Sequence, residues 1–112
     1  MKKQITEKKK IQKIIEVEED VPTTIVDDNK KEFEDAFGKQ VVIFGTIYIY
    51  TGIVVGVNDT RVLLKDTHIV YQTGDFKLYH KNGKFADQQL LPVKEHTVRF
   101  AQIESWGVLE KN

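Results

Sequence analysis

The chain has 112 residues and a formal net charge of zero, with 17 lysines and arginines against 17 aspartates and glutamates. This length suits one small domain with tails, and a neutral molecule binds nucleic acid only through a local patch of charge. The sequence contains no cysteine, which excludes disulfides, thiol catalysis and zinc–thiolate sites. It has no apolar run of membrane-spanning length and no signal-peptide core, so we expect a cytoplasmic protein that does not contact a membrane.

Residues 1–27 are predicted to form a charged arm and linker. Six lysines fall within residues 2–13, the acidic run EVEED follows at 16–20, and Pro22 ends any helix. The isoleucines of the arm have partly helical spacing, but they make only a thin apolar stripe. The arm is therefore either solvated and frayed, or a partly helical segment that reaches a phosphate backbone or a partner protein.

The stretch DDNKKEFEDAFGKQ predicts a short helix over residues 29–37. Asp28 or Asn29 can cap its N-terminus, and Gly38 is a natural C-terminal stop. Phe33 and Phe37 lie four residues apart and therefore share one face of the helix. We expect this face to cover the apolar core of the domain that follows.

From residue 40 onward the chain is rich in β-branched and aromatic residues. The segments VVIFGTIYIY, IVVGV, RVLLKD and HIVYQTG predict successive strands, and TVRFAQIESWGVL predicts a last strand pair or one bent strand. Gly56 suits a bend or a bulge, and Asn82-Gly83 predicts a hairpin inserted at about 73–92. The sequence therefore predicts a mainly β domain at 28–112, a small, strongly bent, closed barrel of five to six strands behind a short helix.

The central stretch from Gly52 to Thr67 reads GIVVGVNDTRVLLKDT. It resembles the first conserved block of the Sm-like superfamily and is most similar to the bacterial Hfq branch. In that branch a glycine precedes alternating apolar residues, an aromatic–Asp turn and an apolar strand that ends in Lys-Asn-Thr. The final HTVRFAQIESW is similar to the second Sm block. The resemblance covers residues 29–67 and, more loosely, the last strand; an SH3-like barrel is the alternative fold.

Three features depart from the Hfq pattern. The turn has Val57-Asn58 in place of the aromatic–Asp pair, and Thr60 stands where Hfq proteins usually place an aromatic residue that stacks on a base. The Tyr-Lys-His motif of that branch is only partly matched by Lys94-Glu95-His96. The inserted segment also resembles small phage or prophage proteins that carry an Sm-like hairpin, which predicts a divergent member of phage type.

The resemblance implies a homo-oligomeric ring, because Sm-like folds commonly pair the edge strands of neighbouring subunits into hexamers or heptamers. Such pairing also removes exposed strand edges, which otherwise favour aggregation. The residues further predict a non-catalytic protein without a cofactor. Ser105 is the only serine, no phosphate-loop or nucleophile motif occurs, and the three histidines lack the ligand spacing of a metal site.

Nine residues are candidate contacts for RNA or a nucleotide-type ligand. Asn58 and Asp59 either satisfy the backbone of their own turn or face a ligand in the pore of a ring, and Arg61 beside them suits a phosphate. The other candidates are Lys94 and His96 before the last strand, and Lys77, Tyr79, His80 and Lys81 in the insert. The interleaved basic and aromatic residues of the insert suit stacking and phosphate pairing. The alternative is an amphipathic hairpin with Phe76 and Phe85 in the core.

Two functions of different classes follow. The first is a ring that binds RNA or a small nucleotide without catalysis. The second is a structural, assembly or protein-interaction module with no nucleic-acid ligand. The composition of the insert favours the first function, whereas zero net charge and the missing aromatic at Thr60 favour the second.

Overall fold

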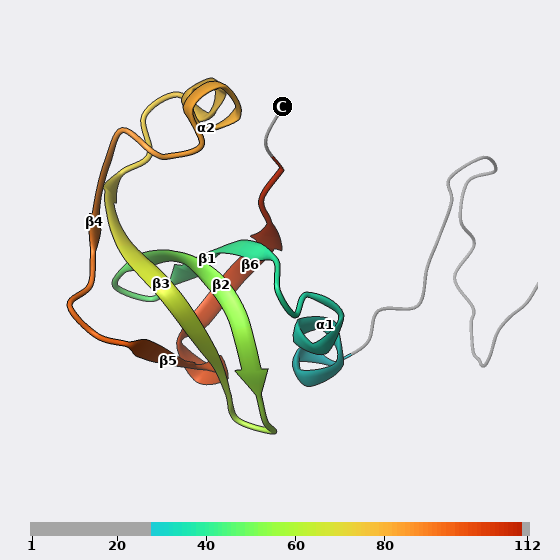
Figure 1. The fold of residues 1–112 in the computed structure, drawn as a ribbon. Coiled ribbons are helices and arrows are strands. Elements are labelled where there is room, and N and C mark those ends of the chain that lie inside the picture. Colours follow the sequence, from blue (N-terminus) through green and yellow to red (C-terminus); the bar gives the residue numbers. More distant parts are fainter. Residues whose placement is uncertain (1–27, 111–112) are drawn as a thin grey trace, which may run out of the picture.

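The computed structural model describes residues 28–110, which form two short helices and six strands (Figure 1). In chain order these are α1 (Asn29–Asp35), β1 (Gln40–Gly45), β2 (Ile49–Val57), β3 (Arg61–Gln72), α2 (Phe76–Asn82), β4 (Asp87–Leu90), β5 (Glu95–Arg99) and β6 (Ile103–Val108). A 3-10 turn at Phe100–Gln102 joins β5 to β6. The predicted mainly β class is confirmed, and the charged arm at 1–27 lies outside the described residues.

The six strands form one antiparallel sheet in the order β4-β3-β2-β1-β6. The fifth strand lies beside the first half of β3, and β4 lies beside its second half. Within the described residues β5 pairs only with β3, and β6 pairs only with β1. The sheet is therefore strongly bent but open between β5 and β6, and the prediction of a closed barrel was wrong.

The bend of the sheet comes from irregularities in β2 and β3. Where the sequence predicted two strands, β3 is one strand of 12 residues. Asp66 interrupts its regular geometry with a φ of 50°, and the pairing register shifts between Thr51 and Ile53 on β2. A second shift falls between Val54 and Gly56, which confirms the predicted bend at Gly56. Bulges of this kind increase local twist and let a sheet curl around its core.

The main core lies on the inner face of the sheet and is covered by α1. Its buried residues are Phe33, Ala36, Val41, Ile43, Val54, Val62, Leu64 and Val98. The side chain of Asp28 accepts a hydrogen bond from the backbone N–H of Lys31 at 2.9 Å, as expected of an N-cap. Phe33 is fully buried and its ring stacks on Trp106 at 3.8 Å, but Phe37 is 50% exposed. The helix therefore covers the core as predicted, with one phenylalanine instead of two.

A second apolar cluster lies on the outer face of the sheet and comprises Val42, Val70, Tyr79 and Phe85. Alternate residues of a strand point to opposite faces, so β1 contributes Val41 to the inner core and Val42 to this cluster. The insert covers the outer cluster with α2, and the predicted hairpin was wrong. Asp75 caps the start of α2 through a bond from the Lys77 N–H, and Gly83 ends the helix with a φ of 76°. The Asn-Gly pair thus closes a helix here, a role that also needs a positive φ.

Two buried threonines provide a matched test of this packing. Thr51 accepts a hydrogen bond from the Gln40 side chain and donates one to the Val41 carbonyl, both at 2.9 Å. The hydroxyl of Thr67 has no partner among the described residues, although both side chains are 2% exposed. We expect Thr67→Val to raise the free energy of unfolding by about 1 kcal/mol and Thr51→Val to lower it by about as much. Urea denaturation measures both, and a loss of stability in Thr67→Val would contradict the orphaned hydroxyl.

Candidate nucleic-acid interface

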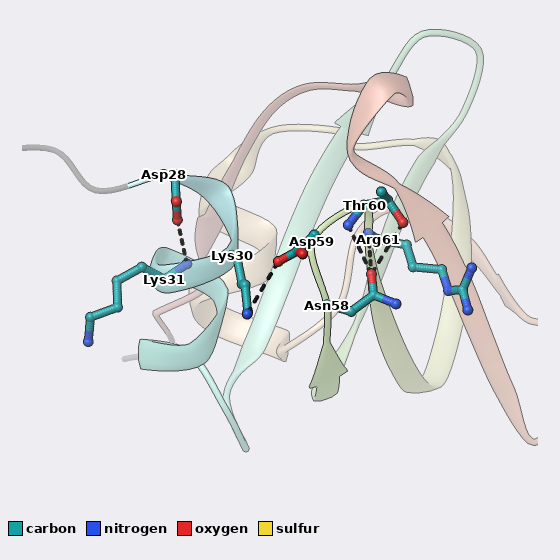
Figure 2. Close-up of polar contacts among 7 residues, drawn as sticks. All are labelled: Asp28, Lys30, Lys31, Asn58, Asp59, Thr60 and Arg61. Atoms are coloured by element: carbon teal, nitrogen blue, oxygen red, sulfur yellow. Dashed lines mark hydrogen bonds and ion pairs between the residues drawn. The ribbon is translucent and has the colours of Figure 1, made fainter.

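The turn between β2 and β3 is held by the side chain of Asn58 (Figure 2). Its Oδ1 atom accepts hydrogen bonds from the backbone N–H of Thr60 at 2.9 Å and of Arg61 at 3.0 Å, and from the Thr60 hydroxyl at 3.3 Å. The Asn58 N–H donates to the Arg61 carbonyl at 3.0 Å. This confirms that Asn58 satisfies the backbone of its own turn, and it leaves the Nδ2 amide as the free donor of the side chain.

Asp59 links this turn to α1. Its carboxylate lies 3.3 Å from the Lys30 ammonium, and its side chain is 85% exposed. An exposed pair of this kind contributes only about 0–1 kcal/mol to stability. The pair nevertheless keeps the Asp59 carboxylate on the α1 side of the turn, away from Arg61 (Figure 2).

Arg61 lies directly opposite Arg99 on the neighbouring strand β5. The Phe100 N–H donates to the Thr60 carbonyl at 2.8 Å, so the adjacent Arg61–Arg99 pair is one without ladder hydrogen bonds, the kind whose side chains approach most closely. Like charges in this position destabilise a sheet. No carboxylate of residues 28–110 forms an ion pair with either guanidinium. Within residues 28–110, two exposed cations are therefore held together without a counter-ion.

A hollow of ≈ 260 Å³ lies beside Arg61, whereas Arg99 lines a separate hollow. The lining residues of the hollow beside Arg61 are Gly56, Val57, Asn58, Arg61, Leu63 and Thr97. The hollow combines a cation and an amide side chain with small and aliphatic groups. Such a surface can pair with an anion and donate hydrogen bonds to it.

Sequence reasoning missed Arg99. The available signal was its position inside HTVRFAQIESW, the segment compared with the second Sm block. Its partner Arg61 is distant in the sequence, so only the pairing of β3 with β5 places the two side chains together. Of the nine predicted contacts, Asn58, Asp59 and Arg61 gather at this end of β3.

The predicted contacts before the last strand lie elsewhere. Lys94 precedes β5 at the end remote from the turn, and His96 pairs in register with Leu64. The His96 ring lies 4.8 Å from the ring of Tyr50, and burial lowers the pKa of His96. A hollow of ≈ 360 Å³ lies between this side of β5 and the loop that joins β1 to β2. His96 therefore lies away from the turn itself, but it lines the same hollow as Arg99 of the arginine pair.

The predicted contacts of the insert lie on α2, which Figure 1 places at the other end of the sheet from the β2–β3 turn. Tyr79 is 8% exposed and packs on Phe85 at 5.0 Å, and burial raises the pKa of its phenol. Most of this ring is packed in the outer cluster, but Tyr79 also lines a hollow of ≈ 280 Å³ together with Phe76 and His80, so ligand contact there stays a prediction. Lys77, His80 and Lys81 are exposed on the helix. They form no continuous surface with the arginine pair.

The described residues contain no group of three or more potential metal ligands. In this part of the chain, no helix is long and apolar enough to cross a membrane.

No protein-family model matches the sequence, and no curated protein matches it. Solved structures do match. A heptameric archaeal Sm protein is 16% identical, with a TM-score of 0.52, and the match covers 71% of this chain and 98% of that protein. The Sm protein of Pyrococcus abyssii in complex with a uridine heptamer is 10% identical, with a TM-score of 0.51 and coverages of 74% and 100%. The SmAP1 heptamer of P. aerophilum is 15% identical, with a TM-score of 0.54 and coverages of 77% and 99%.

These matches identify the class of fold. The chain has an Sm-like fold, a short N-terminal helix followed by a strongly bent antiparallel sheet, and the predicted resemblance is confirmed at this level. Phage-type origin stays a prediction.

Proposed function

We propose that this chain is a non-catalytic Sm-like subunit that assembles into a closed ring and binds single-stranded RNA. The observation that carries the proposal is the pairing of Arg61 with Arg99 beside the rigid β2–β3 turn. Two of the structural neighbours are described as heptamers, and a third holds a uridine heptamer. A cytoplasmic location stays a prediction.

Ring formation follows from the two open edges of the sheet. Within the described residues, β5 and β6 each have one side without a strand partner. Exposed edges of this kind are templates for pairing with another chain. The hollow beside β5 also exposes apolar groups, among them Ile47 at 76% and Tyr48 at 50%. Pairing β5 of one subunit with β6 of the next would satisfy both edges and cover this hollow.

RNA binding follows from the charge at the turn. The chain as a whole is neutral, so attraction to a polyanion must come from a local concentration of positive charge. A ring would repeat the Arg61–Arg99 pair once in every subunit. A guanidinium group can bind phosphate oxygens through two parallel hydrogen bonds. Such bonds would both strengthen the binding of RNA phosphates and fix their position on the ring.

The test is the salt dependence of RNA binding by Arg61→Ala and Arg99→Ala. Each lost phosphate contact should weaken binding and reduce the slope of log K against log salt by about 0.7 for a single strand. Fluorescence anisotropy with a labelled RNA oligonucleotide, measured at several salt concentrations, gives both quantities. Lys81→Ala is the matched control, because it removes one exposed cation from α2 at the other end of the sheet. Equal slopes for all three variants would contradict the arginine assignment.

The second candidate function is an assembly or protein-interaction module without a nucleic-acid ligand. It is favoured by the exposed apolar side chains around the insert, such as Phe76 at 57% and Leu90 at 56%. The ultraviolet absorbance ratio of gently purified protein separates the two functions. Co-purified nucleic acid supports the first, and protein that also fails to bind added RNA at low salt supports the second.

A further inference from the structure

The hollow beside Tyr79 lies on the outer face of the sheet, apart from the arginine pair. It measures ≈ 280 Å³, near the lower end of the volumes of small-molecule sites, which are about 300–1,000 Å³. Its lining comes from β1, from α2 and the loop after it, and from the end of β6 with the two residues that follow. Four of the lining residues are aromatic, namely Phe44, Phe76, Tyr79 and Phe85. The size and the lining are those of a site for one small ligand.

The segments that build the hollow are each held in place. From β1 come Val42, which is buried in the outer cluster, and Phe44, which packs against that cluster. The helix α2 is capped at both of its ends. After β6, the Leu109 N–H donates to the Gln40 carbonyl at 2.8 Å, and the Leu109 side chain packs on the outer cluster. The hollow is therefore formed before a ligand arrives, as is usual for small-molecule sites.

The aromatic rings of the hollow offer both a fixed wall and an accessible face. Tyr79 and Phe85 are 8% and 4% exposed, and their rings pack against each other at 5.0 Å. Phe76 lines the same hollow and is 57% exposed. The face of an aromatic ring carries partial negative charge and attracts cations, most strongly where water is excluded.

The charge of the lining has the same sign as the faces of the rings. Glu110 is the one carboxylate among the lining residues, and no cation of residues 28–110 forms an ion pair with it. His80 adds an imidazole, and no lysine or arginine of the described chain lines the hollow. Aromatic rings with a carboxylate favour a cation whose surface is largely apolar. An alkylated ammonium group has this chemistry, and aromatic-lined pockets are the usual means of recognising it.

From these observations we infer that the hollow under α2 binds a small, free alkylated ammonium ion. The rings of Phe44, Phe76, Tyr79 and Phe85 contact its alkyl groups, and Glu110 balances its charge. The inference goes beyond the proposed function and does not depend on it, because neither the arginine pair nor the β5 edge contributes to this hollow.

The first test titrates the full chain with choline and with its uncharged isostere, in which carbon replaces the quaternary nitrogen. NMR spectroscopy of the methyl groups of Val42 and Leu109 reports binding at the hollow itself. We expect choline to bind at least about fivefold more tightly than the isostere, because both have the same shape and only choline is attracted by the ring faces. Equal affinities, or a failure of choline to shift these signals, would overturn the inference.

The second test removes the two features that select a cation. Phe76→Ala deletes the most exposed ring and should weaken choline binding about fivefold. Glu110→Gln deletes the charge and should weaken it about threefold, since exposed charges attract each other only modestly. Both side chains are exposed, so the fold should not change. The matched controls are Phe37→Ala, a half-exposed ring elsewhere, and Glu104→Gln, an exposed carboxylate of β6. Unchanged choline affinity in both Phe76→Ala and Glu110→Gln would overturn the assignment.

The third test distinguishes the source of the ammonium group, which also occurs on trimethylated lysine side chains of proteins. A short peptide with one trimethyllysine is compared with choline, and the unmethylated peptide is its control. The hollow has the size of one small ligand, so we expect the methylated peptide to bind no more tightly than choline. An affinity of this peptide about tenfold above that of choline would overturn the assignment to a free molecule.

Discussion

Replacing Thr97 with proline is expected to convert the proposed ring into monomers of 13.0 kDa while the subunit stays folded. Thr97 pairs with Leu63 in register, two positions from the Arg61–Arg99 pair. Backbone groups alternate in direction along an antiparallel strand, so the N–H of Thr97 points away from β3, toward the free edge of β5. Proline removes this donor and places its ring in the path of an incoming strand, although an edge strand itself tolerates proline.

Size-exclusion chromatography with light scattering measures the mass of this variant, and circular dichroism reports whether its sheet content is retained. Thr97→Ala is the matched control, because it removes the same side chain but keeps the N–H group. We expect the control to assemble like the wild type. A ring that persists in Thr97→Pro would show that subunits do not meet through the β5 edge.

The largest loss of stability is expected from Phe33→Ala. The Phe33 ring is fully buried between α1 and the sheet, and it stacks on both Phe100 and Trp106. Removing a buried phenylalanine costs about 3–5 kcal/mol, which is comparable to the whole stability of a small domain. We therefore expect this variant to be largely unfolded or to lose most of its resistance to urea.

Phe37→Ala is the control for this prediction, since Phe37 lies four residues further along and is half exposed. It should change the free energy of unfolding by no more than about 1 kcal/mol. Urea denaturation of the two variants side by side measures the difference. Equal losses would mean that α1 uses both phenylalanines, as the sequence alone suggested, and that the observed placement of Phe37 is incorrect.

Features with a local physical cause could be predicted from the sequence. The N-terminal helix was expected because Asp28 supplies a cap and Gly38 a stop, and the bend at Gly56 because glycine suits a bulge. The continuous apolar run in β1 likewise follows from burial on both faces, with Val41 and Val42 in different clusters. In each case the structural feature is determined by residues that lie close together in the sequence.

Other features depend on signals that are ambiguous or distant. The Asn82-Gly83 pair suits a hairpin turn and a helix C-terminus equally, because both need a positive φ. Asp66 adopts a positive φ that sequence patterns do not reveal for an aspartate, so β3 was predicted as two strands. The Arg61–Arg99 pair depends on the pairing of β3 with β5, which no short stretch of sequence specifies. The sequence therefore predicted the contribution of the β2–β3 turn to the candidate interface, including Arg61. It did not predict the contribution of β5, which is Arg99.

Native mass spectrometry of the full chain, with and without a single-stranded RNA oligonucleotide, tests most directly whether this Sm-like chain is a ring that binds RNA. We predict one dominant closed assembly, a hexamer or a heptamer, whose mass increases by that of the oligonucleotide when RNA is added. A monomer that gains no mass from RNA at low salt would contradict both the assembly through the sheet edges and the arginine interface.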